Sequence, residues 1–171
     1  GTGISGGVSS GVPLVPVPAV EDVIGAYREI VRESDQSVGG DFKISNSLVT
    51  PSNSMLGGFP GDLAVLNLGA RKMTVESSRI AGTIVLTQCG EFKLQQPMLL
   101  TPRAGMPALV SGSYFVTNTS DQDFSESGIK ANLNPAAWPY LGESDADTSD
   151  WYPSEINGVV YIGGDAKLDG K

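Results

Sequence analysis

Four acidic residues lie close together in the C-terminal third of the chain: Glu143, Asp145, Asp147 and Asp150. Carboxylates spaced this way in a loop can converge on a hard cation such as calcium, whose protein ligands are oxygen atoms. The EF-hand pattern is not met, because the sixth and twelfth positions counted from Glu143 are Thr148 and Ser154, where that pattern has glycine and glutamate. The spacing predicts either an irregular calcium site, with no other cofactor, or a solvated acidic loop.

Aromatic residues cluster beside these acids, and the most prominent are Trp138, Tyr140, Trp151 and Tyr152. Flat rings next to carboxylates can form a surface that contacts a sugar or another protein. The alternative is that the rings pack in the core and at its rim. A second acidic group, Asp121, Asp123 and Glu126, is interpreted as solvated.

The chain has no histidine and a single cysteine, Cys89. This composition removes the usual general base and the base partner of most serine and cysteine nucleophiles. The N-terminal G-x-G-x-x-G match, Gly1 to Gly6, does not indicate nucleotide binding, because the first predicted helix begins about fourteen residues later. We expect no enzymatic activity; a hydrolase that uses a carboxylate pair such as Asp145 and Asp147 is the open alternative.

The composition and net charge of the chain argue against some classes of binding partner. The 171 residues carry a formal net charge of −8 with a calculated pI of about 4.4, which argues against a nucleic-acid-binding surface. No apolar run is long enough to predict a membrane span. Only 18% of the residues are charged and 22 are glycine, a balance that favours a β-rich fold.

The N-terminal part of the chain is predicted to consist of an extended arm followed by one helix. Residues 1–19 contain no charge and are rich in glycine, serine, proline and valine, which predicts an extended arm or, alternatively, a disordered leader. Residues 20–35 are predicted to be an amphipathic helix with one apolar stripe: Val20, Val23, Ile24, Tyr27 and Val31. The stripe either packs on the protein's own core or contacts a neighbouring subunit.

The remainder, residues 41–171, reads as one β domain. Apolar runs separated by turn residues recur about every ten positions, which is typical of a sandwich or barrel. The segment Thr87–Glu91 is predicted to form a hairpin turn between two of the longest strands. We therefore expect a mainly β protein, an antiparallel β-sandwich of jelly-roll type, with a long acidic and aromatic loop over residues 118–157.

The layout of arm, helix and sandwich is similar in organisation to picorna-like jelly-roll capsid proteins, and the Gly1 start is compatible with polyprotein cleavage. This resemblance implies a non-enzymatic structural subunit of a virion, whose partners are further copies or other subunits. The acidic and aromatic loop would then be exposed, with a host receptor or glycan as a further partner. The alternative is an extracellular-type carbohydrate- or protein-binding β-sandwich module, with or without calcium. Either reading implies a virion or extracellular location.

Overall fold

The computed structural model describes residues 16–53, 56–58, 61–119 and 122–170. Most of the predicted arm, residues 1–15, lies outside the described residues. Helix α1 (Val20–Ile30) begins after Ala19 and carries Glu21 and Asp22 in its first turn, where acidic side chains favour the helix dipole. The predicted end at residue 35 is wrong: α1 ends five residues earlier, because the backbone is extended at Val31 and Ser34–Asp35 form strand β1. Within the described residues no helix is long and apolar enough to cross a bilayer.

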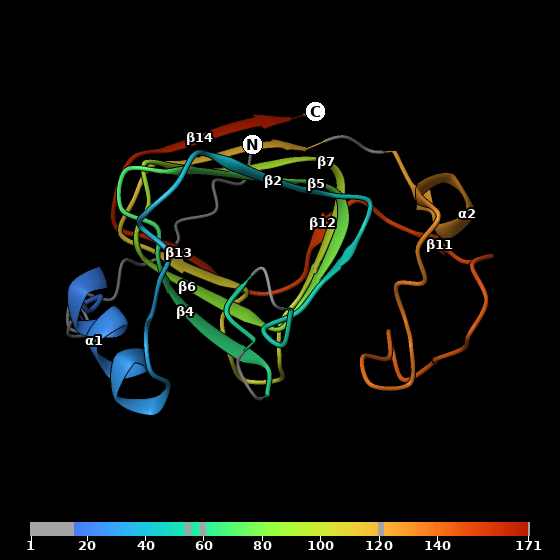
Figure 1. The fold of residues 1–171 in the computed structure, drawn as a ribbon, viewed down its shortest axis with the longest axis horizontal. Helices are drawn as coiled ribbons and strands as arrows, with labels where there is room; N and C mark the ends of the chain where they lie inside the picture. The colour runs from blue at the N-terminus through green and yellow to red at the C-terminus, as the bar shows by residue number, and fades with distance from the viewer. Residues whose placement is uncertain (1–15, 54–55, 59–60, 120–121, 171) are drawn as a thin grey trace, which may run out of the picture.

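Two sheets of parallel strands form the body of the protein (Figure 1). Sheet A has the strand order β1 (Ser34–Asp35), β4 (Leu63–Asn67), β6 (Thr83–Gln88), β8 (Leu109–Ser111) and β13 (Val160–Ile162). The main path of sheet B is β14 (Ala166–Gly170), β9 (Phe115–Thr119), β7 (Glu91–Thr101), β5 (Lys72–Ala81) and β2 (Phe42–Ser45). Every pairing within these two sheets is parallel.

The chain passes alternately from sheet A to sheet B, so it winds in stacked coils in the manner of a parallel β-helix. Strand β5 bends at Ser77, whose φ is 44°, and its register with β7 shifts between Glu76 and Ser78. The second halves of β5 and β7 then pair with β3 (Leu48–Val49) and β12 (Glu155–Ile156). These four segments make a third face, and the ribbon encloses a three-sided section (Figure 1).

The predicted antiparallel jelly-roll sandwich is therefore wrong. The protein is a mixed α/β structure whose strands are mostly parallel. The antiparallel pairings among the described residues are a two-stranded ribbon, β10 (Phe124–Ser125) with β11 (Trp151–Tyr152), and an isolated bridge. Short strands separated by turns are common to sandwiches and to stacked coils. The spacing of the strands along the sequence does not indicate whether neighbouring strands pair parallel or antiparallel.

The predicted hairpin at Thr87–Glu91 is also wrong. Strand β6 ends at Gln88 in sheet A and β7 begins at Glu91 in sheet B, so the segment is a corner between two sheets. Gly90 is required at this corner, because a Cβ atom there would lie 2.3 Å from the carbonyl oxygen of Ala70. The Cys89 amide donates a hydrogen bond to the Ser113 hydroxyl at 2.9 Å, which connects this corner to the next coil.

The core is built from columns of side chains that repeat from coil to coil. One column contains Met73, Phe92 and Phe115, which occupy paired positions in sheet B and are all buried. The rings of Phe92 and Phe115 stack with centroids 6.1 Å apart. A neighbouring column contains Val75 and Leu94. Columns of this kind fill the interior with closely packed apolar side chains. The single cysteine, Cys89, is free and forms no disulfide.

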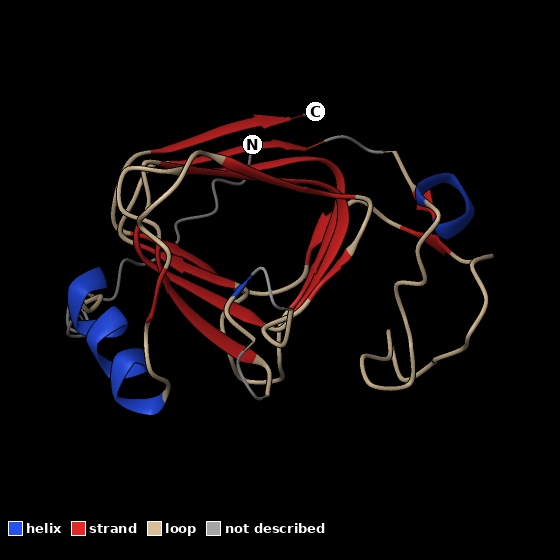
Figure 2. Ribbon diagram, viewed as in Figure 1, coloured by secondary structure: helices blue, strands red, loops and turns tan. Residues whose placement is uncertain are grey.

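Two further groups pack on the outside of the coils (Figure 2). Helix α1 covers the outer side of sheet A, where Val20 and Ile24 pack against Val85 and Val110. Residues 122–153, called the outer segment below, cover the third face; they contain β10, the short helix α2 (Glu126–Ile129) and β11. Leu99 of β7 forms a hydrophobic cluster with three buried side chains of the outer segment: Phe124, Leu133 and Tyr152.

Candidate functional site

A groove of about 820 Å³ lies where the outer segment meets the third face. Its walls include residues of the β7 to β8 connection and the backbone around Gly158. Apolar side chains such as Met106 and Leu141 line the groove together with polar, charged and aromatic ones: Asp62, Arg103, Trp138, Tyr140, Glu155 and Asn157. This volume is within the range of small-molecule sites, and the mixture of rings and charges suits a polar ligand.

Arg79 holds one wall of this groove in place. It is 3% exposed and projects from β5 into the outer segment. Its guanidinium donates hydrogen bonds to the carbonyl oxygens of Leu133 at 2.5 Å, Trp138 at 2.8 Å and Pro139 at 2.8 Å, and to the Thr101 hydroxyl at 3.0 Å. Burial lowers the pKa of Arg79 because the charged form loses its hydration. The neutral carbonyls compensate for that loss.

Tyr140 lines the groove and also packs against Tyr152 in the hydrophobic cluster beneath the outer segment. The Arg79 guanidinium lies 5.3 Å from the centre of its ring, and the Tyr152 ring meets it edge-on at 5.2 Å. Its hydroxyl donates to Glu155 at 3.5 Å across the groove. Burial, followed by the nearby Glu155 carboxylate, raises the pKa of Tyr140. The ring is therefore held from two sides and is a fixed part of the groove wall.

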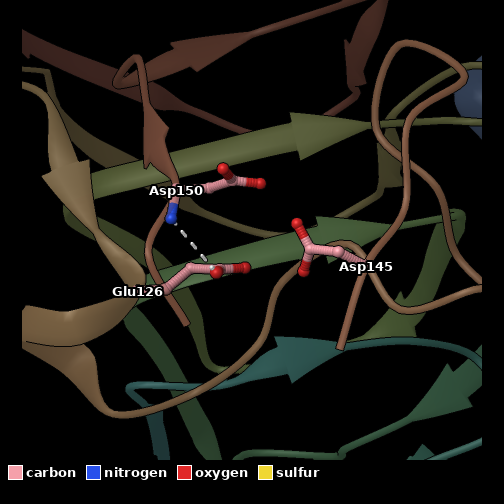
Figure 3. Close-up of side chains that lie close together, drawn as sticks. All are labelled: Glu126, Asp145 and Asp150. Carbon is pink, nitrogen blue, oxygen red and sulfur yellow. Dashed lines mark hydrogen bonds between the residues drawn. The ribbon is translucent and has the colours of Figure 1, made fainter. Parts of the chain in front are cut away.

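Three carboxylates meet on the other side of the outer segment: Glu126, Asp145 and Asp150 (Figure 3). One oxygen atom of each lies within 4.8 Å of the others. Glu126 is fully buried, Asp150 is partly buried and Asp145 is exposed. Oxygen ligands at this separation are suited to a hard cation.

Hydrogen-bond donors surround the Glu126 carboxylate. One of its oxygens accepts from the backbone amide of Leu133 and from the Tyr152 hydroxyl at 3.0 Å, and the other accepts from the Asp150 amide at 3.4 Å. Burial, followed by the hydrogen bond to Glu126, strongly raises the pKa of Tyr152. Tyr152 therefore stays protonated and acts as a donor at neutral pH.

Comparisons with family models, with curated proteins and with solved structures find no match for this chain.

The structure brings two of the four predicted calcium ligands together. Asp145 and Asp150 belong to the cluster, whereas Asp147 accepts hydrogen bonds from the Ser149 amide at 2.8 Å and hydroxyl at 2.6 Å. These bonds lower the pKa of Asp147. Glu143 forms a small backbone bridge with Tyr140 and its side chain is exposed. Calcium binding by the predicted set stays a prediction, and the geometry replaces Glu143 and Asp147 with Glu126.

The predicted contact residues are divided between the interior and the surface. In α1, Val20 and Ile24 are buried against sheet A, and Val23, Tyr27 and Val31 pack partly into the same cluster. These contacts lie within the chain, so a role of the stripe in binding a partner stays a prediction. In β11, Trp151 is 69% exposed while Tyr152 is 1% exposed, because neighbouring residues of a strand face opposite sides. Trp138 and Tyr140 line the groove.

Sequence reasoning missed the residues that organise both sites: Arg79, Glu126 and Asn134, whose Nδ2 atom donates to the Asp150 carboxylate at 2.9 Å. Glu126 belongs to the acidic group that was interpreted as solvated, yet it is 0% exposed; of its neighbours, Asp123 is exposed and Asp121 lies outside the described residues. The Ser125 that precedes it signals the start of α2, since the Ser125 hydroxyl accepts from the Gly128 amide at 3.1 Å and caps this helix, but a cap gives no information about the burial of Glu126. No comparable signal pointed to Arg79 or Asn134.

Proposed function

We propose that the protein is a non-enzymatic structural subunit that associates with a second copy through strand β14. This strand is the outermost strand of sheet B and pairs with β9 on one side. An outermost strand presents a row of backbone N–H and C=O groups that can pair with another chain. The proposal keeps the assembly role expected from the sequence, without the jelly-roll fold.

The inner face of β14 supports this proposal. Ala166 is in register with Phe115, and Leu168 with Thr117, and both partners on β9 are buried. Leu168 therefore continues the buried column that contains Leu94 and Thr117, yet it is 71% exposed. A strand added beyond β14 would place a further side chain on this column and remove apolar surface from water.

The outer face of β14 is complementary to itself. Lys167 and Asp169 lie on either side of Leu168 and form an ion pair of 2.6 Å within the strand. If two copies of β14 pair antiparallel about a two-fold axis at Leu168, each Lys167 lies opposite the Asp169 of the other copy. Opposite charges at directly paired positions favour such a pairing. This charge pattern on an outermost strand is the observation that carries the proposal.

The test is a charge swap measured by sedimentation velocity over a concentration series. We expect a monomer–dimer equilibrium in the parent protein, a weaker dimer in Lys167→Asp, and recovery in the double variant Lys167→Asp/Asp169→Lys. Lys93→Asp is the matched control, because Lys93 lies on the outer face of sheet B in the interior strand β7. A parent protein that stays monomeric at every concentration, or a double variant no better than the single one, contradicts the proposal.

A second candidate function is the binding of a polar ligand such as a glycan in the groove. The position of Tyr140 and Trp138 beside Glu155 and Asn157 favours it, because sugars bind to ring faces and to hydrogen-bonding groups at the same time. A glycan array with Trp138→Ala tests this idea. Trp151→Ala is the control, since Trp151 is 69% exposed and does not line the groove. An array without signal for the parent protein ends this second candidate.

A further inference from the structure

We propose that Asn157 is a site of spontaneous deamidation, a covalent modification that turns a neutral residue of the groove into an acidic one. Asn157 and Gly158 form the one Asn-Gly pair of the chain. They lie in the connection between β12 and β13, in the last coil of the body (Figure 1). Both residues are exposed and both line the groove, so the water that the reaction consumes can reach them.

The reaction requires the two residues and water. The backbone nitrogen of Gly158 gives up its proton and attacks the side-chain carbonyl carbon of Asn157. A C–N bond forms and closes a succinimide ring, while the bond between Cγ and Nδ2 breaks and Nδ2 leaves as ammonia with that proton. Water then opens the ring at either of its carbonyl groups, which gives aspartate or isoaspartate. Nothing is oxidised or reduced, and the new carboxyl group passes its proton to ammonia.

The attacking nitrogen of Gly158 is accessible. Glycine has no side chain that could hinder its approach to the side chain of Asn157. The backbone is anchored on both sides: the Asn157 amide donates to the Leu100 carbonyl at 3.0 Å, and the Val159 carbonyl accepts from the Ala108 amide at 2.8 Å. The Gly158 amide between these bonds has no acceptor among the described residues. No hydrogen bond within that part of the chain therefore has to break before this nitrogen reacts.

The fold requires glycine at position 158. Its φ is 119°, a conformation that residues with a side chain rarely adopt. A Cβ atom at this position would also lie 2.9 Å from the Cγ atom of Pro102. The packing of the last coil thus keeps an asparagine and a glycine adjacent at an exposed position, although this pair is chemically labile.

Other asparagines lack this combination. Asn46 is exposed and is followed by Ser47, but the Ser47 amide donates to the Ser78 hydroxyl at 3.2 Å, so the corresponding nitrogen is engaged. Asn134 is buried and precedes Pro135, which has no backbone N–H to react. The structure therefore favours modification at the Asn-Gly pair over these positions.

Deamidation would change the hydrogen bonding of the groove wall. The Nδ2 atom of Asn157 donates to an oxygen of Glu155 at 2.7 Å, and the same oxygen accepts from the Tyr140 hydroxyl at 3.5 Å. The reaction removes the donor Nδ2 and places a second carboxylate beside Glu155, so an attraction becomes a repulsion. The isoaspartate product also adds one carbon atom to the main chain between β12 and β13. The groove would thus gain negative charge as the protein ages.

The test follows the loss of the side-chain amide at each asparagine. The full chain is incubated at neutral pH and 37 °C, in parallel with a sample unfolded in guanidinium chloride, and both are analysed by peptide mapping with mass spectrometry. In the folded protein we expect Asn157 to react about tenfold or more faster than Asn46, because Ser47 has a side chain and its amide is hydrogen-bonded. Enzymatic methylation of isoaspartate should label the same peptide.

Two results overturn the proposal. One is an Asn157 that keeps its amide in the folded protein under conditions in which the unfolded chain loses it. The other is an equal rate at Asn157 and Asn46 in the folded protein, since the geometry of the Asn-Gly pair would then have no effect.

Two variants test the consequence for the groove. Asn157→Gln is the matched control, because it keeps an amide but has a longer side chain that does not readily close the ring, and we expect no modification at this residue. Asn157→Asp represents one product. We expect it to melt at a lower temperature than Asn157→Gln, because its carboxylate lies beside that of Glu155. Equal melting temperatures of the two variants overturn the repulsion assigned to the product.

Discussion

The guanidinium of Arg79 lies 2.5 Å from the carbonyl oxygen of Leu133, 54 residues further along the chain. Arg79 belongs to a strand of the coiled body and Leu133 to the outer segment, so this bond connects the two parts directly. The further bonds to Trp138 and Pro139 extend the same connection. One buried cation thus orders a stretch of backbone that has little regular secondary structure of its own.

Replacing this cation should release the outer segment. We expect Arg79→Met to lower the free energy of unfolding by about 3 kcal/mol or more, because several buried carbonyls lose a charged donor. Arg103→Met is the control: Arg103 is exposed and pairs with Asp62 at 3.3 Å, and such pairs contribute less than about 1 kcal/mol. Urea denaturation measures both. Similar losses for the two variants would contradict the role assigned to Arg79.

Gly90 allows a second prediction, about the corner between β6 and β7. Gly90→Ala should destabilise the protein by about 1–3 kcal/mol, because the added Cβ meets the Ala70 backbone, which cannot rotate away as a side chain can. Gly25→Ala is the opposite case, since nothing lies within 4 Å of a Cβ at that helical position. We expect it to stabilise by about 0.5–1 kcal/mol. Thermal denaturation distinguishes the two signs.

The third prediction concerns alkaline pH. The pKa of Tyr152 is raised in the folded state, so its contribution to stability is present below the ordinary tyrosine pKa of 10.0 and is lost as the pH rises above that value. Tyr152→Phe should be less stable at pH 8, by about 1 kcal/mol, since it lacks the bond to Glu126. Its stability should fall less steeply than that of the parent protein above about pH 10.

The comparison of these two proteins isolates Tyr152. Burial also raises the pKa values of Tyr27 and Tyr140, but both residues are present in the parent protein and in the variant. Denaturation midpoints measured from pH 8 upward give the two slopes. Parallel slopes would mean that Tyr152 does not lose its proton during unfolding in this range.

The fourth prediction tests the packing of the side-chain columns in the core. Leu94 is fully buried between the paired positions of Val75 and Thr117. Leu94→Ala should cost about 2–5 kcal/mol, because it leaves a cavity in close-packed surroundings. Lys93→Ala changes the adjacent residue of the same strand, whose side chain faces outward, and should have an effect within about 0.5 kcal/mol. Comparable losses at these two positions would argue against the assigned faces of β7.

Sequence periodicity located several elements well. The apolar stripe predicts a helix that starts at Val20, where α1 begins, and the recurring apolar runs predict strands within residues 41–171, where β2 to β14 lie. Apolar periodicity reports which side chains face the interior, and this is a local property of the chain. It does not report which strand lies alongside, so the parallel order of β4, β6 and β8 could not be obtained from it.

The site was less accessible to sequence reasoning than the strands. Asp145 and Asp150 could be proposed because they are close in sequence, whereas Glu126 comes from a segment on the far side of the Trp138 loop. Burial of a glutamate depends on donors such as Tyr152 that reach it only after folding. Arg79 was equally hidden, because its partners are backbone carbonyls, which every residue possesses.

The stacking of coils has a consequence for how the protein unfolds. Strand order places β4 against β6 and β6 against β8, so each layer is stabilised by the layers immediately before and after it. Such an array behaves as a one-dimensional chain of coupled units, in which ordering can start at any unit and spread in both directions. A defect at an interior layer would then split the cooperative transition in two, whereas a defect at a terminal layer would only fray that end.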